Sequence, residues 1–179
     1  MKRIILILAI ILLGFGATRL TFPQKNAQIT HEATSSSITK NFSVESATVS
    51  RVIDGDTIEL VDGRRVRYIG MDSPEIVDKE LPVECFGKEA GEENKRLVEG
   101  RTVLLEKDVS ETDKYGRLLR YVYVGLPAQA GDVMVNDYLV RRGFARVSTF
   151  PPDVKYAGEF IAAEKEAREN NRGLWSDCP

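Results

Sequence analysis

Three short clusters of polar and charged residues are the parts of this sequence most able to do chemistry. They are Asp54-Gly55-Asp56-Thr57, then Arg67 with Asp72-Ser73-Pro74-Glu75, and finally Asp113-Lys114-Tyr115-Gly116-Arg117. Each cluster alone is explained by backbone needs, because Asp and Gly suit hairpin turns and Asp or Ser before Pro suits the start of a helical turn. Together they supply carboxylates and guanidinium groups, which suit a hard cation and a phosphate respectively.

The remaining composition excludes several other kinds of catalytic site. The only histidine is His31, and the only cysteines are Cys85 and Cys178. A Cys/His zinc site therefore lacks ligands, and a Ser-His-Asp triad would depend on one histidine in a polar stretch. With 25 basic and 27 acidic residues, the formal net charge is −2, which argues against binding polyanions through bulk positive charge. Any phosphate recognition must be local.

Short segments rich in β-branched residues place the first two clusters. Residues 47–53, 57–61 and 65–70 read as strands, and Asp-Gly pairs separate them. Asp-Gly between apolar segments is a strong hairpin signal, so we expect a three-stranded meander. We expect a proline-bearing loop over residues 71–84.

The meander predicts that residues distant in sequence meet at one rim. Neighbouring antiparallel strands run in opposite directions, so the start of the second strand lies near the end of the third. Asp56, Arg67, Asp72 and Glu75 should therefore converge. Crowded carboxylates repel one another unless a cation neutralises them, and oxygen ligands without His or Cys favour Ca²⁺ or Mg²⁺.

The rest of the domain alternates helical and strand patterns. Residues 86–98, 133–143 and 155–171 have helical spacing, while 102–107 and 118–124 read as strands. Five short strands with a helix after the third is the order of an OB-fold. We therefore expect an α+β, β-rich domain built on a five-stranded OB-fold β-barrel with about three packed helices.

The N-terminal part differs sharply from the rest of the chain. Residues 1–17 combine a basic start with an apolar run typical of a secretory signal, shorter than the roughly 20 residues of a bilayer-spanning helix. We expect export, with this segment either cleaved or kept as a membrane anchor on the outer face of the cell membrane. Residues 18–46 have the composition of a flexible polar linker, which leaves 47–179 for one folded domain. Nothing indicates an obligate partner, so we expect a monomer.

The two cysteines predict one cross-link. In an exported protein an even pair, here Cys85 and Cys178, is read as a disulfide, although two independent thiols are the alternative. The bond would tie an internal loop to the C-terminus. Closing a loop of roughly 90 residues contributes about 4 kcal/mol in the chain-entropy treatment.

Three ordered segments carry a family resemblance. They are Val52-Ile53-Asp54-Gly55-Asp56-Thr57, Val66-Arg67-Tyr68-Ile69-Gly70-Met71-Asp72-Ser73-Pro74-Glu75 and Asp113-Lys114-Tyr115-Gly116-Arg117. They closely resemble the thermonuclease (staphylococcal or micrococcal nuclease-like) family. Further similarity runs through 84–90, 135–136, 139–143 and 173–175, so the resemblance covers the chain from about residue 47.

The resemblance implies a calcium-dependent endonuclease that hydrolyses DNA, RNA or both and leaves 3′-phosphates. The family's calcium ligands correspond to Asp56, Asp72 and the backbone carbonyl of Ser73. The family usually has Thr at the last position, but Ser should serve because the ligand is the carbonyl. The glutamate credited with activating the attacking water corresponds to Glu75.

The resemblance also implies substrate contacts. The phosphate-binding arginines correspond to Arg67 and Arg117, while Lys114 and Tyr115 match positions that flank the nucleotide. The sequence departs from the family over residues 146–152, where a tyrosine-containing stretch that stacks on the base is replaced.

The missing tyrosines leave part of the base pocket open to interpretation. Phe150 and Tyr156 are the two candidates to stack on the base in their place. The preference for DNA or RNA therefore stays open.

Two alternatives stand beside the nuclease hypothesis. The chain could be a non-catalytic OB-fold module that binds single strands through aromatic stacking and a basic groove. Its domain, however, holds more acidic than basic residues and retains every charged position of the proposed site. The acidic rim could instead bind calcium only to stabilise an extracellular fold.

Overall fold

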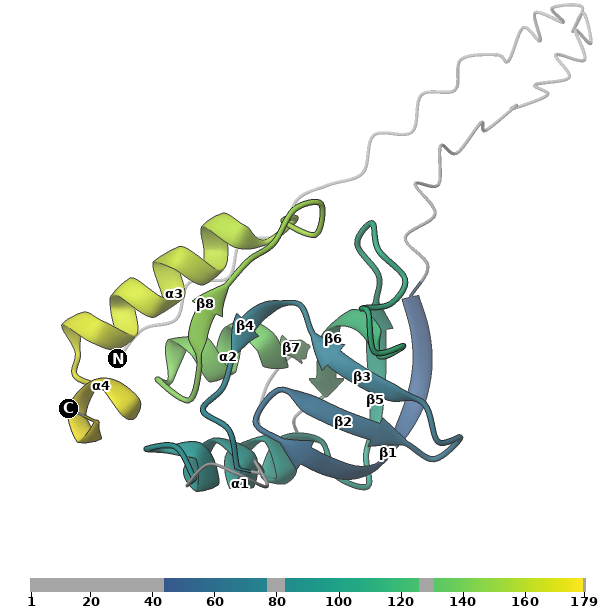
Figure 1. Ribbon diagram of the computed structural model, residues 1–179, viewed down its shortest axis with the longest axis horizontal. Coiled ribbons are helices and arrows are strands. Elements are labelled where there is room, and N and C mark those ends of the chain that lie inside the picture. Colours follow the sequence, from purple (N-terminus) through teal and green to yellow (C-terminus); the bar gives the residue numbers. More distant parts are fainter. Residues whose placement is uncertain (1–43, 77–82, 126–130, 179) are drawn as a thin grey trace, which may run out of the picture. The chain divides into compact units, whose positions relative to one another are not determined.

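The computed structural model describes residues 44–76, 83–125 and 131–178 (Figure 1). The described residues belong to one compact unit, residues 40–179. The expected signal segment, residues 1–17, and most of the expected linker lie outside them. Within the described part, none of the helices has the length and apolar character needed to span a bilayer.

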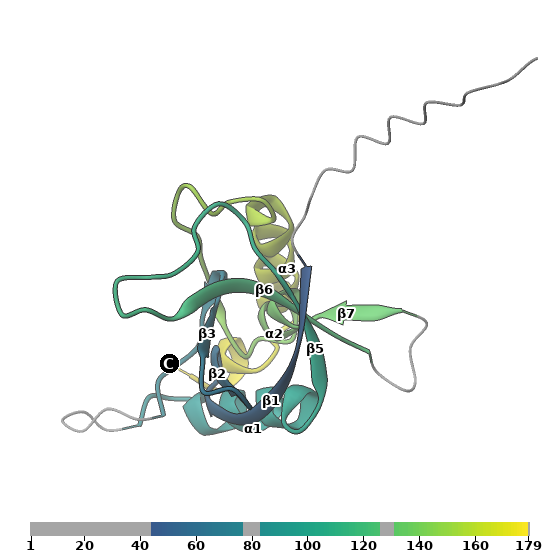
Figure 2. The same cartoon turned by 90° about the vertical axis from the view of Figure 1, so that its right-hand side faces the viewer.

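Five strands close into the barrel that the sequence predicts. In spatial order they are β3 (Arg65–Tyr68), β2 (Thr57–Leu60), β1 (Val44–Asp54), β5 (Thr102–Glu106) and β6 (Leu118–Gly125). Neighbours in this order are antiparallel, and a parallel pairing of β3 with β6 closes the ring. Closure leaves the barrel strands without a free edge at that seam. The curved strands can be followed in Figure 2.

Strand β1 serves both halves of the barrel. Its first part, Val44–Thr48, pairs with β5, and its second part pairs with β2 across two register irregularities. Such irregularities bend a strand and increase its twist, which lets one strand turn a barrel corner. Residues 44–46, which the sequence predicted as linker, pair with β5 and belong to β1.

Three short strands were not expected from the sequence. The chain turns at Gly70, whose φ is 82°, and continues as β4 (Gly70–Asp72), which pairs with β8 (Arg146–Ser148). The expected loop over 71–84 is therefore wrong at its first two residues. A Cβ at position 70 would lie 2.3 Å from Phe160, so glycine is needed for both conformation and space.

The third unexpected strand is β7 (Asp132–Met134). It pairs with the end of β6, so the segment 133–143 is not helical throughout, as the sequence analysis expected. The helix there, α2 (Val135–Arg141), begins only after the pairing ends. Sheet pairing thus decides the first residues of a segment whose amphipathic pattern suits a helix.

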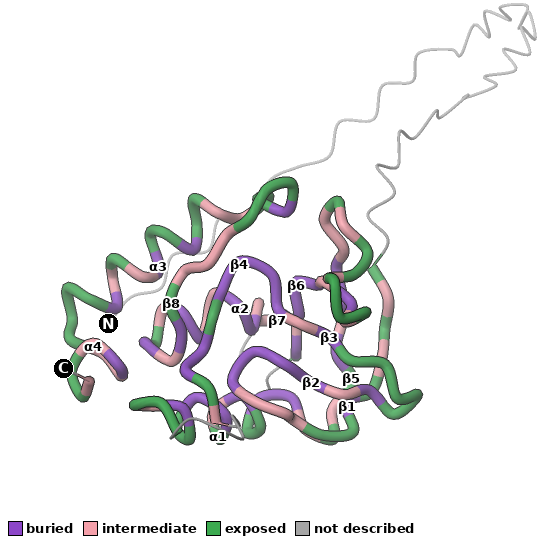
Figure 3. The backbone as a smooth tube through the Cα atoms, in the orientation of Figure 1, coloured by how far each residue is buried: buried purple, intermediate pink, exposed green. Residues whose placement is uncertain are grey.

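The helices cover the barrel and complete its core. They are α1 (Gly87–Val98), α2, α3 (Ala157–Glu169) and the short α4 (Leu174–Asp177). Helix α1 lies beneath the barrel in both cartoon views (Figures 1 and 2), and its Leu97 and Val98 belong to the main core. Helix α3 alternates between buried and exposed positions in Figure 3, in keeping with a helix that packs along one face.

Two further links hold the helices in place. The fully buried Asn136 accepts a hydrogen bond from the Val122 amide at 2.8 Å and donates one to the Ile69 carbonyl at 2.9 Å, which joins α2 to β6 and to the β3–β4 junction. Cys85 and Cys178 form a disulfide, with Cα atoms 5.9 Å apart across 93 positions of sequence. It ties the segment before α1 to the residue after α4.

Candidate active site

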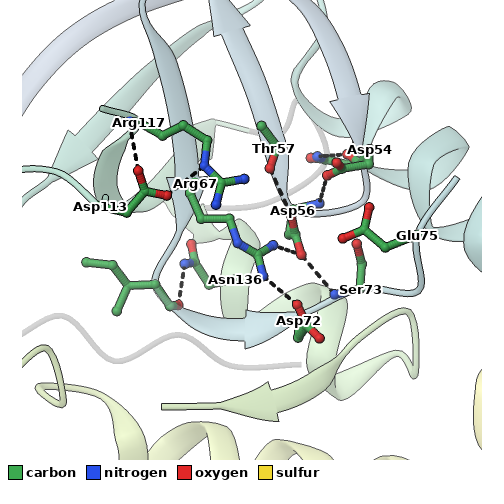
Figure 4. A network of polar contacts seen from close by, with 12 residues as sticks. Asp54, Asp56, Thr57, Arg67, Asp72, Ser73, Glu75, Asp113, Arg117 and Asn136 are labelled. Atoms are coloured by element: carbon green, nitrogen blue, oxygen red, sulfur yellow. Dashed lines mark hydrogen bonds and ion pairs between the residues drawn. The ribbon is translucent and has the colours of Figure 1, made fainter. Parts of the chain in front are cut away.

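The hairpin between β1 and β2 places Asp56 at the barrel rim. Thr57 pairs with Arg67 across β2 and β3, and the Asp56 carbonyl accepts a hydrogen bond from the Tyr68 amide at 2.9 Å. The Asp56 carboxylate is buried and accepts hydrogen bonds from Thr57 Oγ1 at 3.0 Å and from the Ser73 amide at 2.9 Å (Figure 4). The hairpin, β3 and the segment at Ser73 thus meet at one residue.

Arg67 lies between two of the acidic residues. Its guanidinium forms an ion pair with Asp56, and its Nη2 lies 2.5 Å from Asp72 Oδ1. The structure therefore brings together Asp56, Arg67 and Asp72. The sequence predicted an arginine beside the carboxylates and facing a phosphate, whereas in the structure Arg67 bridges Asp56 and Asp72 directly (Figure 4).

Ser73 and Glu75 follow on the same rim. Ser73 is buried against Gly55, where a Cβ would lie only 2.6 Å from the Ser73 side chain, so the hairpin glycine permits this close approach. Glu75 is exposed, and Figure 4 shows its side chain near Asp54 and Ser73. Partial burial of the carboxylate, followed by the negative charge of Asp54, raises the pKa of Glu75.

Asp54 is part of this cluster, although the sequence analysis assigned it only to a turn. Its Oδ1 accepts a hydrogen bond from the Asp56 amide at 3.1 Å. Burial raises the pKa of Asp54, and the neighbouring Arg67 offsets this rise only in part. The sequence signal that could have identified Asp54 is the repeated acid in Asp54-Gly55-Asp56. The same turn holds both carboxylates.

The chemistry of this rim fits a hard cation. Its donor groups are carboxylate and backbone oxygens, which suit such an ion. Burial raises the pKa values of Asp54 and Glu75, and for Glu75 the negative charge of Asp54 adds to the rise. Among the described residues, however, no group of three or more His, Cys, Asp or Glu side chains stands ready to hold a metal ion. Arg67 occupies part of the space between Asp56 and Asp72.

The turn after Thr112 positions Arg117. Asp113 accepts hydrogen bonds from the Arg117 Nε at 2.7 Å, from the Arg117 amide at 3.0 Å and from the Tyr115 amide at 2.9 Å. Burial alone would raise the pKa of Asp113, but these hydrogen bonds outweigh it and lower the pKa. Asp113 is thus the residue that orients Arg117, a role the sequence analysis did not assign.

A cleft of about 560 Å³ lies beside the rim, and Arg67 and Arg117 both line it. Lys114 and the exposed Tyr115 line the same cleft, with the Lys114 ammonium 4.9 Å and the Arg117 guanidinium 5.4 Å from the Tyr115 ring centre. A cation at this distance is attracted to the ring face, which holds the three side chains together.

Phe150, whose side chain is exposed, also lines the cleft. Tyr156, the other candidate for base stacking, does not line the cleft. It packs edge-on against Tyr121 at 4.6 Å, and its hydroxyl lies 3.0 Å from Glu106 Oε2. The structure thus places Phe150, and not Tyr156, where a base could be contacted.

Comparison with known proteins identifies relatives along most of the chain. The family described as staphylococcal nuclease homologue matches residues 65–177. The thermonuclease of Staphylococcus hyicus is 36% identical over 177 residues, covering 97% of this chain and 95% of that protein. The thermonuclease of Staphylococcus intermedius is 42% identical over 134 residues, covering 73% and 76% respectively.

A third relative comes from another genus. The endonuclease YncB of Bacillus subtilis (strain 168) is 38% identical over 134 residues, covering 72% of this chain and 61% of that protein. The family match includes Arg67, Asp72, Glu75 and Arg117 of the site described above. The barrel, the rim and these similarities agree, and the chain belongs to the staphylococcal nuclease family.

Proposed function

We propose that this protein is a calcium-dependent endonuclease that cleaves DNA, RNA or both and leaves 3′-phosphates. That it is a nuclease, a hydrolase of phosphodiester bonds, follows from its family. The observation that supports the finer proposal is the rim itself, where carboxylates in excess of Arg67 adjoin a cleft lined by two arginines.

Asp56, Asp72 and the Ser73 carbonyl are the groups that would hold calcium. They are oxygen donors on two neighbouring segments of chain, and oxygen is the ligand type that calcium prefers. When bound, the ion would neutralise charge on the scissile phosphate. Because Arg67 contacts both aspartates, its guanidinium could turn toward the cleft once a cation replaces it there.

Glu75 is the group placed to act as general base. Its carboxylate is exposed, so water reaches it, and its raised pKa makes it a better proton acceptor than an ordinary glutamate. It would take a proton from a water that attacks phosphorus in line, so that the 5′-oxygen leaves. Arg67 and Arg117 would bind the phosphate oxygens as charge develops on them.

The cleft would bind the nucleotide beside the scissile bond. Tyr115 and Phe150 are exposed aromatic rings that line it, and Lys114 adds a positive charge. Aromatic rings bind bases by stacking with little sequence preference. This arrangement suits both DNA and RNA and leaves the choice between them to groups that contact the sugar.

The test is digestion of DNA and of RNA by the full chain with Ca²⁺ and with a calcium chelator. We expect cleavage only with Ca²⁺, and a loss in the Glu75→Gln variant. Binding without cleavage in both conditions would support a non-catalytic OB-fold module instead. A melting temperature that rises with Ca²⁺, without any cleavage, would support a purely structural calcium site.

We also propose that the protein is exported and acts outside the cytoplasm as a monomer. The basic start and apolar run of residues 1–17 support export, and the polar stretch after them suits a tether or a cleaved leader. Cell fractionation, with mass spectrometry of the N-terminus, distinguishes a secreted form from one anchored in the membrane. Recovery of the chain in the cytoplasm would contradict the proposal.

A further inference from the structure

Glu84 forms two hydrogen bonds with the backbone of Glu75. The Glu84 amide donates a hydrogen bond to the Glu75 carbonyl at 3.1 Å, and the Glu75 amide donates one to Glu84 Oε2 at 3.2 Å. These two bonds hold both the amide and the carbonyl of Glu75, although Glu84 lies nine residues away in the sequence. Among the described residues no hydrogen bond to the Glu75 carboxylate is present, and these two backbone bonds hold the residue that carries it.

Glu84 is held in turn by two elements. Its carbonyl accepts a hydrogen bond from the Gly87 amide at 3.0 Å, at the start of α1. The next residue, Cys85, is bonded to Cys178, which directly follows α4. Helix α4 is itself anchored, because Leu174 is buried and its amide donates to the Gly143 carbonyl at 2.9 Å.

Helix α1 lies directly against Glu75 and Ile76. A Cβ at Gly87 would stand 2.7 Å from the Glu75 carbonyl oxygen, and one at Gly91 would stand 2.2 Å from Ile76 Cδ1. These glycines therefore permit a close approach of α1 to Glu75 and Ile76 that the Cβ of any other residue would block. The loop carrying Glu75 thus rests on α1 from one side, while the disulfide holds Glu84 in place beside it.

We propose that Glu84 and the Cys85–Cys178 disulfide form a clamp that positions Glu75 for catalysis. The proposal rests on the proposed function, in which Glu75 is the general base. A base must stand within hydrogen-bond reach of the water that it activates, and a shift of about 1 Å can cost up to about 100-fold in rate. Glu84 is a positioning residue here, since its oxygen contacts the Glu75 backbone and it would act on the reaction through Glu75.

The decisive comparison uses two substitutions at one position. Glu84→Ala removes the acceptor for the Glu75 amide, whereas Glu84→Gln keeps an oxygen there. We expect kcat to fall about 10-fold in Glu84→Ala with KM unchanged, and Glu84→Gln to restore most of the rate. Glu93→Ala is the matched control, because Glu93 lies on α1 and bonds to Arg96 and Tyr138, away from Glu75. It should leave kcat unchanged.

A double variant separates positioning from general stability. If Glu84 acts through Glu75, then adding Glu84→Ala to Glu75→Gln should slow the reaction no further. The Cys85→Ser, Cys178→Ser double variant should show the same fall in kcat as Glu84→Ala. Should that double variant fail to fold, the Glu84→Ala and Glu84→Gln pair still decides.

The outcomes distinguish the clamp from the proposed function. If Glu75→Gln retains the normal rate, the assignment of the base is wrong and the clamp is overturned with it. If Glu75→Gln is slow but Glu84→Ala cleaves normally, only the clamp is overturned. A fall in Glu84→Ala that Glu84→Gln does not restore, or that adds fully to Glu75→Gln, also overturns it.

Discussion

Two acidic clusters of this protein have opposite charge balance. At one, the buried Glu106 accepts hydrogen bonds from Tyr123 at 2.6 Å and from Tyr156 at 3.0 Å, and it forms an ion pair with Lys155. Burial by itself would raise the pKa of Glu106, but these donors outweigh it and lower the pKa. Every charge in this cluster has a partner inside the protein.

The rim around Asp56 is organised in the opposite way. One guanidinium, that of Arg67, is shared between Asp56 and Asp72, while the pKa values of Asp54 and Glu75 are raised. The negative charge here is therefore only partly neutralised within the protein. The comparison indicates that Glu106 serves stability, whereas the charge left at the rim is what the proposed cation would neutralise.

The largest expected effect is at Glu75. Glu75→Gln keeps the size of the side chain but removes the base, so kcat should fall at least about 100-fold. Its melting temperature without calcium should not fall, because a poorly compensated charge is removed. Steady-state cleavage and thermal unfolding measured on the same sample check both parts. A normal rate would exclude Glu75 as the base.

Arg117→Lys should give the next largest loss. An ammonium cannot reproduce the two parallel hydrogen bonds of a guanidinium to phosphate, so we expect a fall of about 10-fold to 100-fold in kcat/KM. Arg51→Lys is the matched control, since Arg51 pairs with Glu59 on the barrel surface and does not line the cleft. Equal losses in the two variants would contradict a specific role for Arg117.

Glu106→Gln should affect stability and leave catalysis intact. Removing the carboxylate from its partners should cost about 2 kcal/mol of unfolding free energy at neutral pH. Because the folded pKa of Glu106 is lowered, its stabilisation is present above the ordinary glutamate pKa and is lost as pH falls through the folded value. Chemical denaturation across pH 3 to 7 checks this, and a difference that persists at low pH would contradict it.

The rim predicts the opposite pH dependence without calcium. Raised pKa values mean that Asp54 and Glu75 favour the folded state when protonated, so their contribution is lost as pH rises through those values. In Glu75→Gln that part of the pH dependence should shrink. Adding Ca²⁺ should also flatten it in the unsubstituted protein.

The smallest expected effect is at Phe150. Phe150→Ala should raise KM about fivefold, the lower end of what one stacked base contributes, with little change in kcat. Tyr156→Phe is the control, since its hydroxyl belongs to the Glu106 cluster and its ring does not line the cleft. A change in KM for Tyr156→Phe and none for Phe150→Ala would reverse this assignment.

Local sequence determined the elements that carry the site. Asp-Gly pairs and short alternating segments predict the first three barrel strands, and antiparallel pairing then brings Asp56 near Arg67 and Asp72. These relations are short in sequence, so turn chemistry and a period of two residues are enough to predict them. The helices near residues 86–98 and 155–171 were predicted for the same reason.

Tertiary packing decided what the sequence could not. Contacts between distant segments decide three features of the site. Arg67 bridges two carboxylates, and Glu84 forms hydrogen bonds with the Glu75 backbone. Phe150 rather than Tyr156 lines the cleft. Strand β4 also depends on such contacts, and it exists because Gly70 turns the chain toward β8. Local propensity carries no information on such partners, because the free energy that selects them arises only when the barrel closes and the helices pack against it.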